Sequence, residues 1–178
     1  LLDNARACAA AAESARARGF AVETAQDISE QSVGEGASAL VSRLAELQRR
    51  EGARGVCLVS GGEFACPVRG KGLGGRSSET ALRCAFEFEK MLSSEVAGRT
   101  TRAAVALCAG TDGVDGNSPA AGALADHLTL TRARAFGLDA SKFLEESDAY
   151  SFFEQLGDAI ITGPTGTNVR DVRILLAG

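Results

Sequence analysis

Short apolar runs that end in glycine-rich polar loops are the feature that most constrains the fold of this chain. Three runs are followed at once by loops that combine glycine with carboxylate or hydroxyl side chains: 55–59 with loop 60–63, 103–108 with loop 109–116, and 159–161 with loop 162–168. Runs of this length are typical of buried strands, and open α/β folds keep their sites in loops at strand ends. The pattern predicts strand ends that share a cleft.

Helical patterns alternate with these runs. Helices are expected from a cap at 3 or 4 to about 18, from 34 or 38 to 51, and from 79, after a cap at 77 or 78, to 92. Shorter helices are expected at 120–126, 131–136, 141–145 and 150–156. Strands are expected at 20–24, 55–59, 64–68, 103–108, 159–161 and 172–176, with a hairpin around Gly61. Interleaved helices and strands with one hairpin predict an α/β fold, a three-layer α/β/α arrangement with a mixed β-sheet. Without an internal repeat or a linker, residues 1–178 are expected to form a single α/β domain.

Charge and composition narrow the class of partner. The 178 residues carry a net charge of -4 with Lys and Arg scattered, which argues against nucleic acid as the main partner. No apolar run reaches the roughly 18 residues of a membrane span, so no membrane partner is expected. Five cysteines without a Cys-x-x-Cys pair indicate a reducing compartment, and we expect a cytoplasmic protein.

Two of the loops permit two interpretations each. Loop 60–63 is either a hairpin turn or a site segment that presents Glu63. Loop 70–76 combines glycines with Lys71 and Arg76 ahead of a helix, as loops that cradle a phosphate do. It lacks the Gly-Lys-Ser/Thr ending of a Walker A loop and the Gly-x-Gly-x-x-Gly spacing, so a flexible surface loop is the alternative.

The other two loops, 109–116 and 162–168, also permit two interpretations each. Asp112 and Asp115 are three residues apart, so both could reach one cation or one substrate hydroxyl; a turn with two exposed carboxylates is the alternative. Loop 162–168 suits phosphate or carboxylate recognition, but its residues also form ordinary turns. The single histidine, His127, lies outside these loops, which gives nucleophilic triad chemistry little support.

Taken together, the four loops predict a cleft with one strong cation, Arg76, and several carboxylates. Phosphoryl transfer depends on positioning and charge neutralisation rather than on a nucleophilic side chain. The combined pattern therefore favours phosphoryl transfer.

Ordered motifs along the chain resemble a known family. They are Ser60-Gly61-Gly62-Glu63, Gly74-Gly75-Arg76 with Glu79, Ala109-Gly110-Thr111-Asp112-Gly113-Val114-Asp115-Gly116, Ala121-Gly122-Ala123, Asp148-Ala149-Tyr150-Ser151-Phe152-Phe153, and Thr162-Gly163-Pro164-Thr165-Gly166-Thr167-Asn168-Val169 with Asp171. In this order they resemble the C-terminal region of the class II glycerate kinases, including the MOFRL domain, a family once called hydroxypyruvate reductases. The resemblance covers nearly the whole chain, most specifically residues 56–178.

The resemblance implies ATP-dependent phosphorylation of D-glycerate to 2-phosphoglycerate, with ATP and Mg as cofactors. It also implies an active site shared with an N-terminal kinase domain, and a homodimer is possible. Arg76 matches an arginine important for activity and is the expected catalytic residue, on the glycerate carboxylate or on the transferring phosphoryl group. The expected substrate-binding residues are Ser60, Glu63, Asp112, Asp115, Thr165 and Asn168; the phosphate-binding ones are Lys71, Gly74 and Gly75, and the metal ligands are Asp112 and Asp115.

Departures from the family pattern keep other functions open. Ser77 stands where the family usually has Asn, and Phe64-Ala65-Cys66 stands where it usually has Thr-Thr-Val. The N-terminal domain with its catalytic lysine is absent from these 178 residues, so we expect the chain alone to be inactive. The alternatives are a non-catalytic ligand-binding or dimerisation module, and a hydroxypyruvate reductase as in the older name of the family. The chain lacks the dinucleotide fingerprint that a reductase would use.

Overall fold

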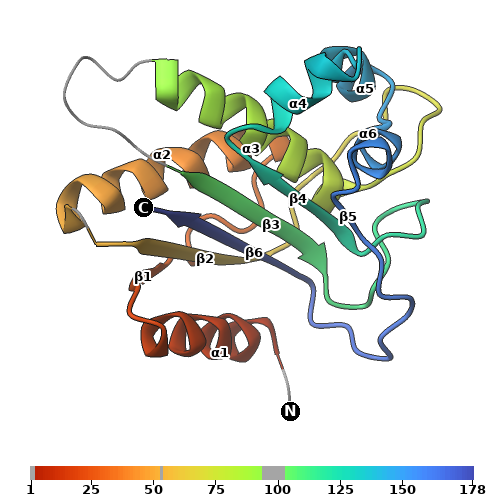
Figure 1. Cartoon of the computed structure of the whole chain (residues 1–178). Helices are drawn as coiled ribbons and strands as arrows, with labels where there is room; N and C mark the ends of the chain where they lie inside the picture. The colour runs from red at the N-terminus through yellow and green to blue at the C-terminus, as the bar shows by residue number, and fades with distance from the viewer. Residues whose placement is uncertain (1–2, 53, 94–102) are drawn as a thin grey trace.

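The chain folds into a mixed six-stranded sheet covered by helices on both faces (Figure 1). The computed structural model describes residues 3–52, 54–93 and 103–178. The strands are β1 (Ala21–Thr24), β2 (Val56–Gly62), β3 (Ala104–Gly110), β4 (Gly122–Asp126), β5 (Ala159–Ile160) and β6 (Asp171–Ala177). The helices are α1 (Asn4–Ala17), α2 (Val33–Glu51), α3 (Arg76–Ser93), α4 (Thr129–Ala135), α5 (Ala140–Glu145) and α6 (Ala149–Leu156).

The strand order is β1-β2-β6-β3-β4-β5. Strands β1 and β2 are parallel, and every other neighbouring pair is antiparallel. The last strand of the chain, β6, is thereby inserted between β2 and β3 at the centre of the sheet. This arrangement confirms the predicted α/β fold with a mixed sheet.

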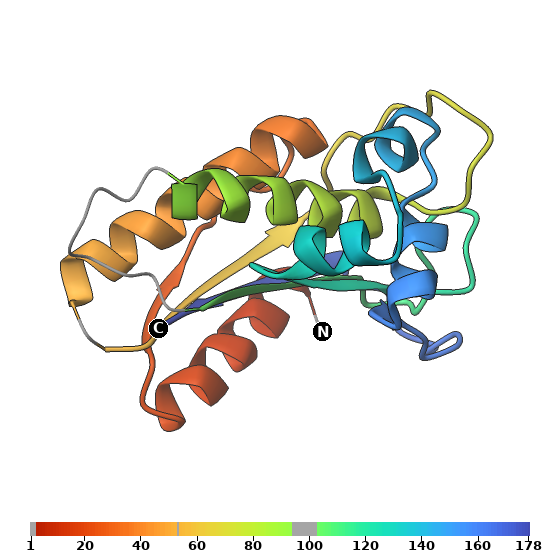
Figure 2. The ribbon, with the colours of Figure 1, turned by 45° about the horizontal axis from the view of Figure 1, so that its top comes forward.

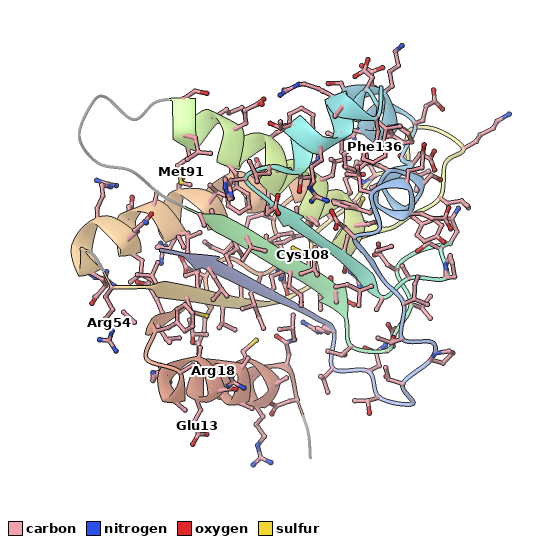
Figure 3. The ribbon with its side chains drawn as sticks, viewed as in Figure 1. Glu13, Arg18, Arg54, Met91, Cys108 and Phe136 are labelled. Carbon is pink, nitrogen blue, oxygen red and sulfur yellow. The ribbon has the colours of Figure 1, made fainter. Side chains whose placement is uncertain are left out.

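The two faces of the sheet are covered differently. Figure 2 shows α1 alone on one face and α2, α3 and α4 on the other. Small side chains of α1, Cys8 and Ala12, pack against Cys57 and Val59 of β2, so this helix lies close to the sheet. Its polar Glu13 points away from the sheet in Figure 3. A helix with only a narrow apolar stripe covers a sheet in this way.

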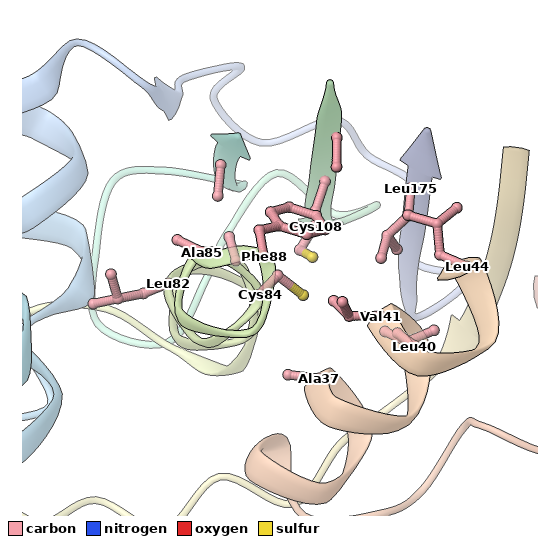
Figure 4. Packing of buried hydrophobic residues seen from close by; sticks show 14 of the residues in the cluster. Ala37, Leu40, Val41, Leu44, Leu82, Cys84, Ala85, Phe88, Cys108 and Leu175 are labelled. Carbon is pink, nitrogen blue, oxygen red and sulfur yellow. The ribbon is translucent and has the colours of Figure 1, made fainter. Parts of the chain in front are cut away.

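The main core lies on the opposite face, between the sheet and the pair α2–α3. Leu40 and Leu44 of α2 and Phe88 of α3 are fully buried there with Leu175 of β6 (Figure 4). Burial of side chains of this size contributes about 1.5–3 kcal/mol each. This packing fixes α3 across β3 and β4, which in turn fixes where α3 begins.

The hairpin expected around Gly61 is wrong. Strand β2 continues through Ser60 and Gly61 to Gly62, where it pairs with β6 rather than with the following segment. The strand expected at 64–68 is also wrong, since among these residues only Ala65 makes a bridge, an isolated one to Ser32. Gly61 is needed for close approach, because a Cβ there would overlap the Asn4 side chain of α1. The glycine signals helix-on-sheet contact, not a turn.

The helix expected at 120–126 is also wrong, since residues 122–126 form β4 and pair antiparallel with β3. Alanine favours helices by only a few tenths of a kcal/mol over most residues, which a ladder of backbone hydrogen bonds outweighs. The small side chains of Ala123 and Ala125 are fully buried beneath α3 and its neighbours. The remaining expected helices and strands are present, with ends shifted by a few residues.

Two further expectations can be compared with the described residues. All five cysteines are unpaired. Among the described residues, no helix is both long and apolar enough to cross a membrane.

The fold brings three chain segments to one edge of the sheet. Strands β2 and β3 end there and β6 begins there, since Gly62 and Gly110 both pair with Asp171. Helix α3 begins beside them, at Arg76. The predicted meeting of loops at strand ends is therefore realised at this edge.

Candidate functional site

A cavity of about 520 Å³ opens at this edge of the sheet. Its wall comes from residues 64–79, from the loop after β3, and from the head of β6, and it includes Arg76, Asp112, Asp115 and Asp171. Loops 70–76 and 109–116 therefore share a cleft, as predicted. Among the described residues, loop 162–168 supplies none of the lining side chains.

Arg76 is the first residue of α3, and two carboxylates hold it. Its Nε donates to Asp171 Oδ2 at 2.6 Å and its Nη2 to Asp171 Oδ1 at 3.2 Å. Nη2 also donates to Glu63 Oε1 at 2.6 Å. Within the described part of the chain, Nη1 has no partner. A guanidinium fixed along one side can still donate to an anion from its free corner.

Burial and pairing shift the pKa values of this pair. Burial raises the pKa of Asp171, although the Arg76 hydrogen bond and charge act in the opposite direction. The hydrogen bond to Asp171 raises the pKa of Arg76. Arg76 therefore keeps its positive charge under all ordinary conditions, and the cleft has a permanent cation in its wall.

Asp115 is buried and serves the start of α3. Its Oδ1 accepts from the backbone N–H of Ser77 at 2.9 Å, and its Oδ2 from those of Gly75 at 3.0 Å and Ser78 at 2.9 Å. The Ser78 hydroxyl adds a fourth bond at 2.6 Å. A carboxylate placed here satisfies amides that a helix N-terminus leaves unpaired and complements the helix dipole. Both oxygens are thus occupied by the protein itself.

Backbone N–H groups of the glycine-rich loop 70–76 also donate to partners within the protein. The N–H groups of Gly72 and Leu73 donate to Glu146 O and Asp148 Oδ1, and that of Gly74 donates to Asn117 Oδ1. Gly75 lies so close to Asp115 that a Cβ would overlap its side chain. The phosphate-binding prediction for Gly74 and Gly75 rested on free inward amides, and these amides have protein partners. Lys71 is exposed, outside the lining of the cavity.

Asp112 is half-buried in the cavity wall and is less committed than Asp115. Its Oδ1 accepts from the Val114 N–H at 3.1 Å, and its Oδ2 accepts a long bond of 3.4 Å from Asn168 Nδ2. Thr165 donates its N–H to the Asp112 carbonyl and its hydroxyl to Thr111 O. Thr165 and Asn168 therefore brace the Asp112 loop from outside the cavity.

Ser60 and Glu63 have different positions. Ser60 is fully buried, and its hydroxyl donates to Ile28 O at 2.6 Å. It does not line the cavity among the described residues, so its predicted substrate contact has no support from its position. Glu63 is exposed and reaches Arg76. Its carboxylate thus competes for the cation that an anionic substrate would use.

Three buried charged residues near the cleft were not among the predicted site residues: Asp171, which holds Arg76 as described above, Glu79 and Arg173. Glu79 accepts from Arg83 at 2.7 and 3.0 Å and from Arg69 at 3.3 Å, and it lines the cavity. Arg173 is 2% exposed, lies with its guanidinium carbon 3.7 Å from the centre of the Phe64 ring, and donates to Gly61 O. Burial lowers the pKa of Arg173. Its place on the buried face of the expected strand 172–176 was the available signal.

Cys66 in the cavity wall should be chemically quiet. Burial, together with the charge and hydrogen bond of Glu79, raises its pKa to about 12. At pH 8 we expect iodoacetamide to label Cys66 roughly a thousandfold more slowly in the folded chain than in the chain unfolded by guanidinium, because only the thiolate reacts. Peptide mass spectrometry after timed quenching measures both rates.

Glu79→Gln should raise the labelling rate of Cys66 in the folded chain by about tenfold. It removes a negative charge beside the thiol and so lowers the pKa of Cys66. Glu87→Gln, on the same helix and paired with Lys90, is the matched control and should leave the rate unchanged. Equal rates for Cys66 in the folded and unfolded chains would contradict the geometry.

The described residues do not form a metal site of their own. No group of three or more His, Cys, Asp or Glu side chains among them is arranged to hold a metal ion. Asp115 is saturated by amide and hydroxyl donors, which leaves Asp112 as the more available of the two predicted metal ligands.

Known proteins resemble this chain in sequence. The model of the MOFRL family matches residues 56–171, which is more than half of the chain. The D-glycerate 2-kinase of Thermotoga maritima is 41% identical over 118 residues, covering 66% of this chain and 26% of that protein. A putative hydroxypyruvate reductase of Agrobacterium vitis is 39% identical over 123 residues, covering 68% of this chain and 29% of that protein.

A solved structure extends the match over the whole fold. The crystal structure of glycerate kinase from Thermotoga maritima superposes with a TM-score of 0.85 at 30% identity, covering 99% of this chain and 41% of that chain. The chain spans about a quarter of the length of the curated relatives it matches.

Proposed function

The chain belongs to the MOFRL family, and on that premise we propose that it is the C-terminal domain of an ATP-dependent glycerate kinase. The reaction is the phosphorylation of D-glycerate to 2-phosphoglycerate. Residues 1–178 form one domain of the enzyme, and a preceding kinase domain completes the active site. The free cysteines suit a cytoplasmic enzyme.

The position of Arg76 is the observation that supports this proposal most directly. Its guanidinium lies in the wall of a cavity, is 37% exposed, and is held from behind by a buried carboxylate. A planar guanidinium donates two parallel hydrogen bonds to a carboxylate or a phosphoryl group. Arg76 therefore binds the glycerate carboxylate or neutralises charge on the transferring phosphoryl group, which is the main requirement of phosphoryl transfer.

Asp112 lies in the wall of the same cavity, and a neighbouring loop braces it from outside. The Asp112 carboxylate accepts hydrogen bonds and so suits the hydroxyls of glycerate, while Thr165 and Asn168 hold its loop in place. An anion at Arg76 and a hydroxyl at Asp112 would orient one small hydroxy acid by its two ends. Asp115 acts indirectly, by fixing the start of α3.

The described residues do not form a complete binding site for Mg or ATP. The N–H groups of residues 72–75 have protein partners, and both carboxylate oxygens of Asp115 are occupied. No group of three metal-binding side chains is present in the described ranges. We therefore assign this domain the binding and orientation of the acceptor substrate. Lys71, exposed beside the cavity, remains available to a phosphate presented by the other domain.

Two other functions are distinguishable from this one. A non-catalytic binding or dimerisation module would need no ligand at Arg76. A hydroxypyruvate reductase, the name carried by the Agrobacterium vitis relative, would need a nicotinamide dinucleotide. The cavity favours the kinase, because it contains an arginine that can bind an anionic substrate. A reductase would need a dinucleotide-binding loop, and the sequence of this chain does not contain that fingerprint.

Calorimetry of this chain tests the proposal. D-glycerate is expected to bind, and Arg76→Ala is expected to weaken binding about 10- to 100-fold, since a charge-assisted hydrogen bond contributes about 1.5–3 kcal/mol. Arg49→Ala, which removes an exposed arginine on α2, is the matched control and should bind like the natural chain.

Further titrations separate the alternatives. Binding of NADH in place of D-glycerate would favour the reductase. A chain that binds neither D-glycerate, Mg-ATP nor NADH but sediments as a homodimer would favour the structural module. Equal D-glycerate binding by the natural chain and Arg76→Ala would remove the basis of the kinase proposal.

A further inference from the structure

The two carboxylates that contact Arg76 differ in exposure and in the number of hydrogen bonds they accept from it, and both properties affect how easily a ligand can replace them. The Asp171 side chain is 4% exposed and makes two hydrogen bonds to the guanidinium. The Glu63 side chain is 42% exposed and makes one. Both are anions within 2.6 Å of the same cation, yet only one of them is built into the sheet.

Asp171 is held by its strand. It is the first residue of β6 and pairs with Gly62 on one side and Gly110 on the other, so its backbone is fixed between two strands. Its carbonyl accepts a further hydrogen bond, at 2.9 Å, from the Asn4 side chain of α1. A two-point contact from a fixed carboxylate sets both the position and the plane of a guanidinium.

A second positive charge, that of Arg173, acts on Asp171 in addition to Arg76. Burial raises the pKa of Asp171, while Arg76 and then Arg173, two residues along the same strand face, lower it. Arg173 is itself buried, and its Nε has no partner within the described residues. The pair of arginines offsets part of the cost of burying one carboxylate beneath the cleft.

Glu63 is held loosely by comparison. It follows the last residue of β2 and reaches Arg76 through a single exposed ion pair. Exposed pairs contribute little to stability because water and salt compete with them. A ligand carboxylate can replace Glu63 on the guanidinium with almost no loss, and it would then use Nη2 and the unpartnered Nη1.

We propose that Asp171 is the positioning residue of Arg76 and that Glu63 is an internal anion which the substrate carboxylate displaces from it. The displacement half rests on the proposed function, because it assumes that D-glycerate binds here. The positioning half does not. Glu63 thereby changes from a predicted substrate ligand into a competitor, which also selects for ligands that carry a negative charge.

The positioning half is tested by NMR spectra of the arginine Nε–H groups in this chain, with the Arg76 signal assigned by its loss in Arg76→Lys. Asp171→Asn should shift that signal or broaden it beyond detection, because Nε donates to Asp171. Glu63→Gln and the surface control Glu13→Gln should leave it in place, since Glu63 contacts only Nη2. An unchanged Arg76 signal in Asp171→Asn, or its loss in Glu63→Gln, overturns the positioning role.

The displacement half is tested by titrating D-glycerate into the same variants. Glu63→Gln should bind as tightly as the natural chain or more tightly, whereas Asp171→Asn should bind about tenfold more weakly. Arg76→Lys keeps the charge but not the two-point contact, so it should weaken binding similarly and serves where Asp171→Asn fails to fold. Weaker binding by Glu63→Gln overturns displacement.

A natural chain that binds no D-glycerate contradicts the proposed function and the displacement half together. The Nε spectra still decide the positioning half in that case, so the two failures remain distinguishable.

Discussion

Asp115→Ala is expected to lower the free energy of unfolding by about 3–6 kcal/mol, one of the two largest effects of any single change near the cleft. Asp115 is 3% exposed and accepts from three backbone N–H groups and one hydroxyl at the start of α3. Its removal leaves the buried N–H groups of Ser77 and Ser78 without an acceptor, and each unsatisfied group costs about 1–3 kcal/mol. The Gly75 N–H and the Ser78 hydroxyl keep only longer bonds, to Ser78 Oγ at 3.2 Å and to Gly75 O at 3.3 Å. Urea denaturation monitored by circular dichroism measures the difference.

Two other variants provide a comparison for the loss of stability in Asp115→Ala. Asp115→Asn keeps one acceptor oxygen and the shape, so it should cost less, about 1–3 kcal/mol. Asp112→Ala removes a half-exposed carboxylate from the same loop and should cost about 1 kcal/mol or less. A loss in Asp115→Ala no greater than that in Asp112→Ala would show that Asp115 does not organise the start of α3.

Gly116→Ala is expected to destabilise the chain by at least about 3 kcal/mol. Gly116 has a φ of +63°, a conformation that costs alanine about 1–2 kcal/mol. A Cβ there would also overlap the Gly74 carbonyl oxygen and lie 2.8 Å from Gly75 Cα, so backbone would have to move. Because Gly74 and Gly75 lead directly into Arg76, the same change should displace the cation of the cleft.

The chain offers a matched control for this substitution. Gly137 has a similar φ of +73°, but a Cβ there would meet nothing within 4 Å. Gly137→Ala therefore carries only the conformational cost, about 1–2 kcal/mol. Thermal unfolding of the two variants separates overlap from backbone strain. Equal losses in both would show that loops 70–76 and 109–116 are not in contact as described.

Local patterns were sufficient for most of the elements. The apolar spacing of Leu40, Leu44 and Leu47 predicted α2, and all three are buried in the core. The run before Ala109 predicted β3, and its alternating burial agrees with a strand covered on one face more than the other. Such elements are predictable because their own residues contain the period that burial requires.

Two of the wrong predictions, the helix at 120–126 and the turn at 60–63, have a common cause. Residues 120–126 have a helical composition, and residues 60–63 have a turn composition, yet both join the sheet through partners outside the local segment. Residues 122–126 pair with β3, and Ser60 and Gly61 pair with β6, more than a hundred residues later. Local propensities amount to a few tenths of a kcal/mol per residue and are outweighed by such pairing.

The candidate site divides in the same way. The sequence by itself determined the class of the fold, the meeting of glycine-rich loops at strand ends, and Arg76 as the cation among several carboxylates. Only the tertiary structure decided what each carboxylate does: Asp115 caps α3, Asp171 holds Arg76, Glu63 competes for it, and Asp112 faces the cavity. The reason is physical. Each carboxylate oxygen takes its partner from whichever donor the fold brings within hydrogen-bond distance, and those donors lie up to 95 residues away in the chain.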